Sequence, residues 1–202
     1  MAVVILVRNA MPVVQPGVHP VRWRLDDLGR SAVASLALAL PDELSPTVWS
    51  SSEARAEETA EMLIGTRGDL HARLRLDPEL REVGRPTSWS STYAEDLAGY
   101  FRNGEREGWE PATAVMTRMT SVIDRALREA AGVPVAVVTH GLALSLYVGA
   151  ACGLRPAGFL HSLLHPDAWL LDVSAGRLER LDVDDDLDLS QDFPPDSAGD
   201  GG

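Results

Sequence analysis

The sequence contains no lysine, one cysteine and no long apolar run; all 18 of its basic residues are arginines. The single cysteine, Cys152, excludes a disulfide within the chain, which fits a reducing compartment. No stretch approaches the roughly 20 apolar residues of a membrane-spanning helix. The apolar run 2–7 also lacks the basic residues that begin a signal peptide. We therefore expect a soluble, cytoplasmic protein that does not associate with a membrane.

Positive charge is scarce at the end of the chain. Eight aspartates and no basic residue lie between Asp182 and Gly202, so two thirds of the net charge of −12 belongs to this stretch. A segment of Asp, Gly, Ser and Pro buries too little apolar surface to fold. We expect one folded domain over residues 1–181 and a disordered acidic tail over 182–202. Nucleic acid is not an expected partner for so acidic a chain.

Apolar strands alternate with amphipathic helices along the expected domain. This order is typical of an α/β fold, here a three-layer α/β/α sandwich with a mainly parallel central sheet and an antiparallel edge. Residues 84–111 are irregular in composition, and we interpret them as a substrate-side insertion with one short helix over 93–101. The expected strands are 2–7, 47–49, 74–76, 135–139, 169–173 and 178–183. The remaining expected helices are 28–40, 54–64, 113–131 and 141–152.

Polar residues follow two of these strands directly. Arg8 and Asn9 come after the run 2–7, and His140 comes after the run 135–139. The carboxyl ends of parallel strands meet at one edge of a sheet, where α/β proteins bind their ligands. These residues therefore predict a binding site at that edge.

Five segments in order resemble the motifs of the histidine phosphatase superfamily, which has the phosphoglycerate mutase-like fold. The resemblance extends over residues 2–181. It implies a phosphomonoester hydrolase rather than a mutase, because a mutase needs more substrate-binding machinery than this chain shows. The segments are Val7-Arg8-Asn9-Ala10, Leu25-Asp26-Asp27-Leu28-Gly29-Arg30, Ser50 to Ala60, Leu80-Arg81-Glu82 and Val138-Thr139-His140-Gly141.

The resemblance implies a role for each matching residue. A phosphoryl group needs fixed positive donors around its oxygens, and Arg8 and Arg55 fit this need. His140 would also donate to the phosphoryl group, and the N–H groups of the helix that begins near Gly141 would add to the site. Glu82 is the candidate general acid for the leaving group.

The residue that should attack phosphorus is absent. In the family, the histidine after the arginine of the first motif becomes phosphohistidine, and here that position is Asn9. An amide nitrogen is not a nucleophile at neutral pH, so this route is closed as the sequence stands. Three explanations are open: an engineered substitution that traps substrate, a natural relative that binds a phospho-ligand without turnover, and a repurposed enzyme that uses His140 or Glu82 for acid/base chemistry.

The expected partner is a small phosphorylated or anionic molecule, with no metal ion and no cofactor. Gln15, seven residues after Arg8, is a further candidate for phosphate contact. Specificity should lie in the loop 11–24 and in the insertion 84–111, which carry no motif. The sequence does not indicate the identity of the substrate or the oligomeric state.

Overall fold

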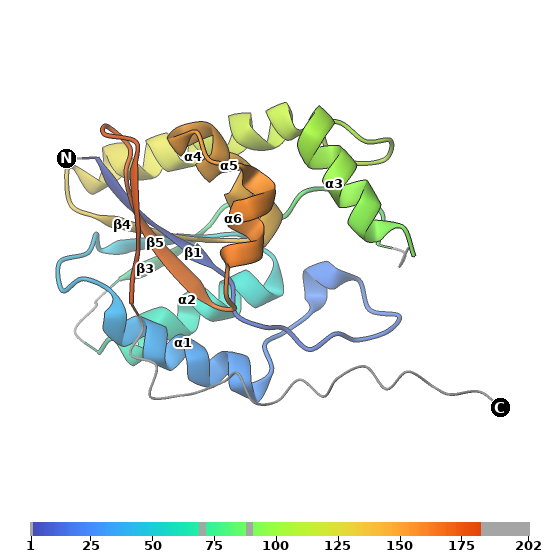
Figure 1. The fold of residues 1–202 in the computed structure, drawn as a ribbon. Helices are drawn as coiled ribbons and strands as arrows, with labels where there is room; N and C mark the ends of the chain where they lie inside the picture. Colours follow the sequence, from blue (N-terminus) through green and yellow to red (C-terminus); the bar gives the residue numbers. More distant parts are fainter. Residues whose placement is uncertain (1, 69–71, 88–90, 183–202) are drawn as a thin grey trace.

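The fold is organised around one six-stranded sheet. A computed structural model describes residues 2–68, 72–87 and 91–182. The strand order is β3-β2-β4-β1-β5-β6 (Figure 1). The first four strands are parallel, whereas β5 is antiparallel to both β1 and β6. The strands are β1 (Val3–Arg8), β2 (Thr47–Ser50), β3 (Arg73–Leu76), β4 (Val135–Thr139), β5 (Asp167–Asp172) and β6 (Arg177–Arg180).

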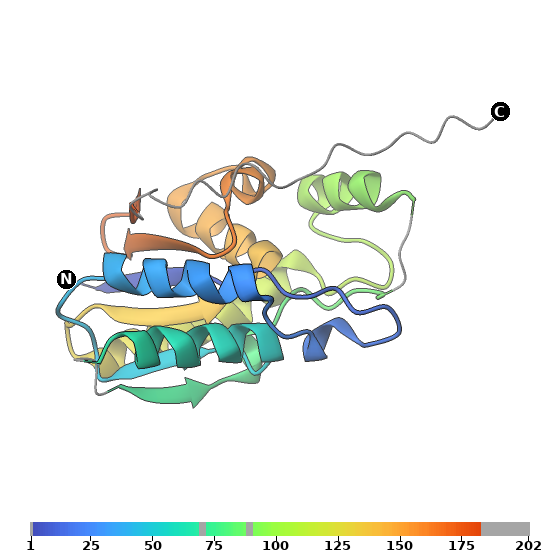
Figure 2. The same ribbon diagram turned by 90° about the horizontal axis from the view of Figure 1, so that it is seen from below.

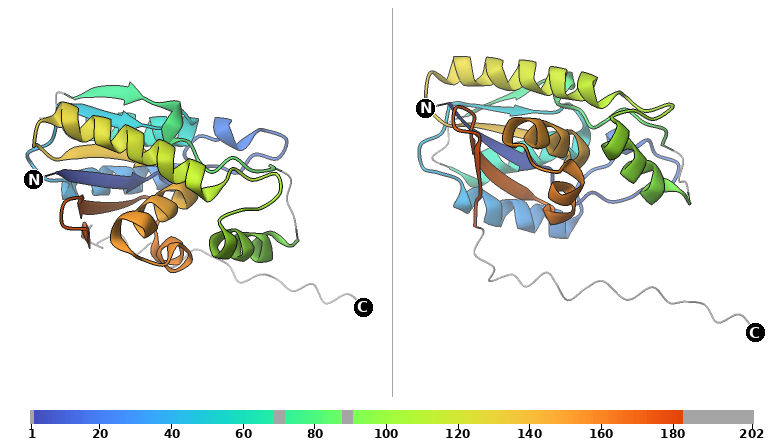
Figure 3. Two further views of the ribbon diagram at one scale, coloured as in Figure 1. Left: turned by 90° about the horizontal axis from the view of Figure 1, so that it is seen from above. Right: turned by 45° about the horizontal axis from the view of Figure 1, so that its top comes forward.

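Helices cover both faces of the sheet. Helices α1 (Asp27–Ala39) and α2 (Ala54–Thr66) lie side by side on one face (Figure 2). Helices α4 (Ala112–Ala130), α5 (Gly141–Cys152) and α6 (Pro156–Ser162) lie on the other (Figure 3). Alternate side chains of β1 belong to two separate cores, with Ile5 and Val7 packed in one and Val4 and Leu6 in the other. This two-sided burial explains why β1 is apolar at every position before Arg8 rather than at every second one.

Two segments extend beyond the carboxyl end of the parallel strands. One is the loop that contains the 3₁₀ helix η1 (Pro20–Arg22), and the other contains helix α3 (Tyr93–Asn103) (Figures 1 and 3). Helix α3 is fixed to the body of the protein by Tyr100, which is fully buried and donates its hydroxyl to the Glu110 carbonyl at 2.8 Å. These segments flank the edge where the sequence predicts a site.

The predicted three-layer α/β/α sandwich with a mainly parallel sheet is confirmed, including the antiparallel edge. Helix α6 and the 3₁₀ helices η1 and η2 (Pro78–Leu80) were not predicted, because short helices carry little hydrophobic periodicity. The predicted acidic tail lies outside the described residues from residue 183 onward, and the domain limits and the insertion stay predictions. No helix in the described ranges is both long and apolar enough to cross a bilayer.

Candidate active site at the carboxyl edge of the sheet

The pairing of β1 with β4 brings the first two predicted site segments together. Arg8 lies opposite Thr139 in this parallel pair, and the Asn9 N–H donates to the Thr139 carbonyl at 2.9 Å. The residues that follow the two strands, Asn9 and His140, are therefore neighbours although 131 positions separate them in the chain. The predicted convergence of the two strand ends is present in the structure.

Asn9 is buried, with 3% of its surface exposed, and its amide is held at both ends. The amide nitrogen Nδ2 donates to the Ala10 carbonyl at 2.8 Å. The amide oxygen Oδ1 lies 3.1 Å from Nδ1 of His140. Because this oxygen only accepts hydrogen bonds, the contact assigns a proton to His140 Nδ1.

His140 is a neutral, enclosed imidazole. Only 1% of it is exposed, and its Nε2 lies 2.8 Å from the hydroxyl of Ser51. With the proton on Nδ1, Nε2 accepts from the Ser51 hydroxyl, which itself accepts from the Glu53 N–H at 3.2 Å. Burial lowers the pKa of His140 well below its usual value, and the nearby cations Arg55, Arg118 and Arg8 lower it further. Both ring nitrogens are thus engaged with protein groups.

Arg8 presents a partly buried cation that forms no ion pair with a carboxylate among the described residues. Its Nη1 donates to the carbonyl of Leu163 at 2.9 Å and to that of Leu164 at 3.4 Å. Its Nε is buried and has no hydrogen-bond partner among the described residues. Burial lowers the pKa of Arg8, and the charges of Glu82 and Asp167 act in the opposite direction. The guanidinium is therefore partly desolvated, and its Nε donor is unused.

Arg55 lies at the start of α2 and is held more completely than Arg8. Its Nη2 forms an ion pair with Glu53 at 2.7 Å, and its Nη1 donates to the Pro20 carbonyl at 2.7 Å. The second contact ties the η1 loop to the edge of the sheet. Glu58, on the same helix, does not pair with Arg55 and instead binds Arg30 and the N–H of Leu25.

Glu82 caps helix α5. Its Oε1 accepts from the Ala143 N–H at 2.9 Å and its Oε2 accepts from the Leu142 N–H at 3.2 Å, and Oε1 also accepts from the Val83 N–H. A carboxylate at this position complements the helix dipole. The N–H groups of Leu142 and Ala143, at the helix start where phosphate is expected to bind, are therefore bonded to Glu82.

Three contributors to this site were not predicted. Ser51 and Glu53 lie in the segment Ser50 to Ala60, in which the sequence predicts a site role for Arg55 alone. Glu53 contacts Arg55, accepts from the Glu82 N–H at 2.9 Å and lies 3.8 Å from His140. Arg118 of α4 donates to the Glu82 carbonyl at 3.2 Å and fixes that segment from behind. Their contacts join residues that are far apart in the sequence, so no local pattern predicts them.

His165 is the fourth unpredicted residue, and the sequence carries no signal for it. Its Nδ1 lies 3.2 Å from the Asn9 carbonyl. Its pKa falls to about 4, chiefly through burial and then through the charge of Arg8, while the Asn9 carbonyl raises it and Arg55 lowers it. A second neutral imidazole thus lies beside Asn9.

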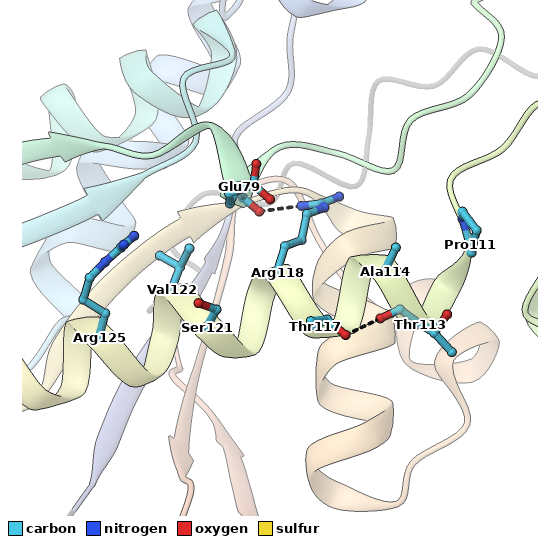
Figure 4. A pocket seen from close by; sticks show the side chains of 9 residues that line it. All are labelled: Glu79, Pro111, Thr113, Ala114, Thr117, Arg118, Ser121, Val122 and Arg125. Carbon is cyan, nitrogen blue, oxygen red and sulfur yellow. Dashed lines mark hydrogen bonds between the residues drawn. The ribbon is translucent and has the colours of Figure 1, made fainter.

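Gln15 is exposed, and its side chain makes no hydrogen bond within the described part of the chain. A hollow of about 590 Å³ lies elsewhere, over α4 and η2 (Figure 4). Arg118 lines it and donates to the Glu79 carbonyl at 2.6 Å, but Arg8, Asn9, Arg55 and His140 do not line it. No group of three or more potential metal ligands occurs in the described residues.

The model of the histidine phosphatase superfamily (branch 1) matches residues 19–177. The chain therefore belongs to the histidine phosphatase superfamily. The match begins after Arg8 and Asn9 and does not include the first motif. The position of that motif at the end of β1 is what supports its resemblance to the family. A comparison with curated proteins finds no significant match.

Solved structures share the fold. A mycobacterial glucosyl-3-phosphoglycerate phosphatase is 18% identical, with a TM-score of 0.66 over 89% of this chain and 96% of that one. A Thermus thermophilus protein is 24% identical, with a TM-score of 0.63 over 89% and 98%. A putative alpha-ribazole-5'-P phosphatase from Escherichia coli is 19% identical, with a TM-score of 0.61 over 88% and 93%. The phosphoglycerate mutase-like fold is thus confirmed.

Proposed function

We propose that this protein binds the phosphoryl group of a small phosphomonoester at the carboxyl edge of its sheet and hydrolyses it slowly. Arg8 and Arg55 bind the phosphoryl group in this proposal, and His140 holds the Asn9 amide from the buried side. Asn9 takes the place of the family's nucleophile, and its amide does not attack phosphorus. Two of the similar structures are named as phosphatases of phosphorylated small molecules, which supports a substrate of this class.

The observation that carries the proposal is the state of Arg8. Burial of a cation without an ion-pair partner is unfavourable, and Arg8 is partly buried. No carboxylate forms an ion pair with Arg8 in the described residues, and its Nε is buried without a partner. A phosphoryl group would place negative charge in direct contact with this guanidinium. Arg55, in contrast, already has Glu53 as its partner, so it contributes less uncompensated charge.

The network around Asn9 supports slow turnover. Asn9 Nδ2 is bonded to the Ala10 carbonyl, so the amide keeps its orientation without ligand. The ring nitrogens of His140 bond to Asn9 and Ser51, and the Glu82 carboxylate bonds to the N-terminus of α5. This arrangement favours binding and positioning, and it lends less support to a repurposed reaction in which His140 or Glu82 exchanges protons with a substrate.

Thermal unfolding with inorganic phosphate tests the binding site. A ligand present at 100 times its dissociation constant stabilises a protein by about 2.7 kcal/mol, which raises the melting temperature by about 5–10 °C in a domain of this size. We expect this rise in the unaltered protein and its loss in Arg8→Gln. The control is Arg177→Gln, because Arg177 is highly exposed on β6. An equal rise in Arg8→Gln and in the control would reject Arg8 as the phosphate ligand.

A further inference from the structure

We propose that Nε2 of His165 attacks phosphorus in place of the imidazole that is missing at position 9. This inference rests on the proposed function, because it requires a phosphoryl group beside Arg8. It assigns a catalytic role to a residue on the β5 side of the site, outside every motif of the sequence. The step is a covalent phosphoryl transfer to a histidine in the loop between α6 and β5.

The position of His165 follows from its hydrogen bond to the backbone of Asn9. Nδ1 of His165 lies 3.2 Å from the Asn9 carbonyl, and a carbonyl oxygen only accepts. The proton therefore lies on Nδ1, and Nε2 carries a free lone pair. Nε2 has no hydrogen-bond partner among the residues that the structure describes. The carbonyl bond fixes both the tautomer and the orientation of the ring, which is the support that a nucleophilic imidazole needs.

The neighbours of His165 are the groups that would hold the phosphoryl group. Arg8 donates to the carbonyls of Leu163 and Leu164, which directly precede His165 in the chain. The charge of Arg8, and to a lesser degree that of Arg55, lowers the pKa of His165. At neutral pH the imidazole is therefore unprotonated, and a phosphoryl group bound by the two arginines would lie beside it.

His165 is also the accessible candidate among the nucleophilic side chains at this edge. It is partly exposed, whereas Ser51 is 0% and His140 is 1% exposed. His140 further lacks a free nitrogen, since Nδ1 donates to Asn9 and Nε2 accepts from Ser51. A substrate would reach Nε2 of His165 without displacing this buried network.

The reaction balances without any group beyond the substrate and water. The lone pair of Nε2 forms a bond to phosphorus while the ester P–O bond breaks, and the departing oxygen takes a proton from water. A second water then attacks phosphorus, the P–N bond breaks, and inorganic phosphate and neutral His165 are released. Arg8 and Arg55 neutralise the phosphoryl oxygens in both steps.

The experiment compares hydrolysis of para-nitrophenyl phosphate by the unaltered protein, by His165→Asn and by His161→Asn. Asparagine at position 165 keeps a donor for the Asn9 carbonyl, much as Asn9 itself donates to the Ala10 carbonyl, and removes Nε2 with the rest of the ring. His161 is an exposed histidine of α6 and serves as the matched control. The phosphate-induced rise in melting temperature is measured for all three proteins.

We expect His165→Asn to lower the hydrolysis rate at least about 100-fold while its phosphate-induced rise is unchanged, and His161→Asn to alter neither. In the unaltered protein, rapid quenching should yield an acid-labile, alkali-stable phosphoryl group that mass spectrometry places on His165. An unchanged rate in His165→Asn, a phosphoryl group on another residue, or no hydrolysis by a phosphate-binding unaltered protein would overturn the inference. Absence of any phosphate-induced rise would instead overturn the phosphate site itself.

Discussion

Gly141 lies directly against the guanidinium of Arg8. A Cβ atom at position 141 would lie 3.1 Å from Arg8 Nε and 3.1 Å from Leu160 Cδ1. Contacts this short force the neighbouring side chain to move. Two features therefore place Arg8. One is the absence of a side chain at position 141, and the other is the pair of hydrogen bonds to the carbonyls of Leu163 and Leu164.

We predict that Gly141→Ala displaces Arg8 and weakens phosphate binding about 3- to 10-fold, or roughly 0.7–1.4 kcal/mol. Isothermal titration calorimetry with inorganic phosphate measures this change. Gly65→Ala is the matched control, because Gly65 also lies in a helix but has open space around its Cα. Equal phosphate affinity in Gly141→Ala and Gly65→Ala would show that Arg8 does not need the glycine.

At the scale of helices and strands, the sequence predicted the elements whose pattern is local. β1 and β4 are continuous apolar runs, and α1 begins where Asp26 accepts from the Gly29 N–H. Helix α6 has only seven residues and no distinct apolar stripe, so no local signal marks it. His165 follows α6 and owes its place to the Asn9 carbonyl, which only the folded chain brings near.

The same limit applies to the site. The carboxyl ends of β1 and β4 could be predicted to meet, because parallel strands impose that geometry. The bonds of Glu82 to α5 and of Arg55 to the η1 loop could not be predicted, since they join residues 60 and 35 positions apart. The roles assigned to Arg8, Asn9, Arg55, Glu82 and His140 stay proposals, to be tested by the binding and rate measurements.

At the scale of the whole molecule, burial of neutral histidines links folding to pH. The pKa of His140 lies well below 6.5 in the folded protein, and that of His165 lies at about 4. Below pH 6.5 the unfolded chain therefore binds protons that the folded chain does not. Stability is then lost as the pH falls below 6.5 and is retained above it.

We predict that lowering the pH from 7.5 to 5.5 reduces the free energy of unfolding by about 1.4 kcal/mol through His140 alone, with His165 acting in the same direction. Urea unfolding in phosphate-free buffer measures the change. His140→Gln should show a smaller pH dependence than the unaltered protein. Stability that is equal or greater at pH 5.5 would contradict the assignment of a neutral buried imidazole at position 140.

The central claim is that this edge of the sheet is a phosphatase site without its position-9 imidazole, and the most direct measurement is phosphatase activity after Asn9→His. The variant introduces an imidazole at the end of β1, next to Arg8 and His140. We expect para-nitrophenyl phosphate hydrolysis at least about 100-fold faster than in the unaltered protein, without added metal. A folded Asn9→His variant that binds phosphate but hydrolyses the ester no faster would contradict the account.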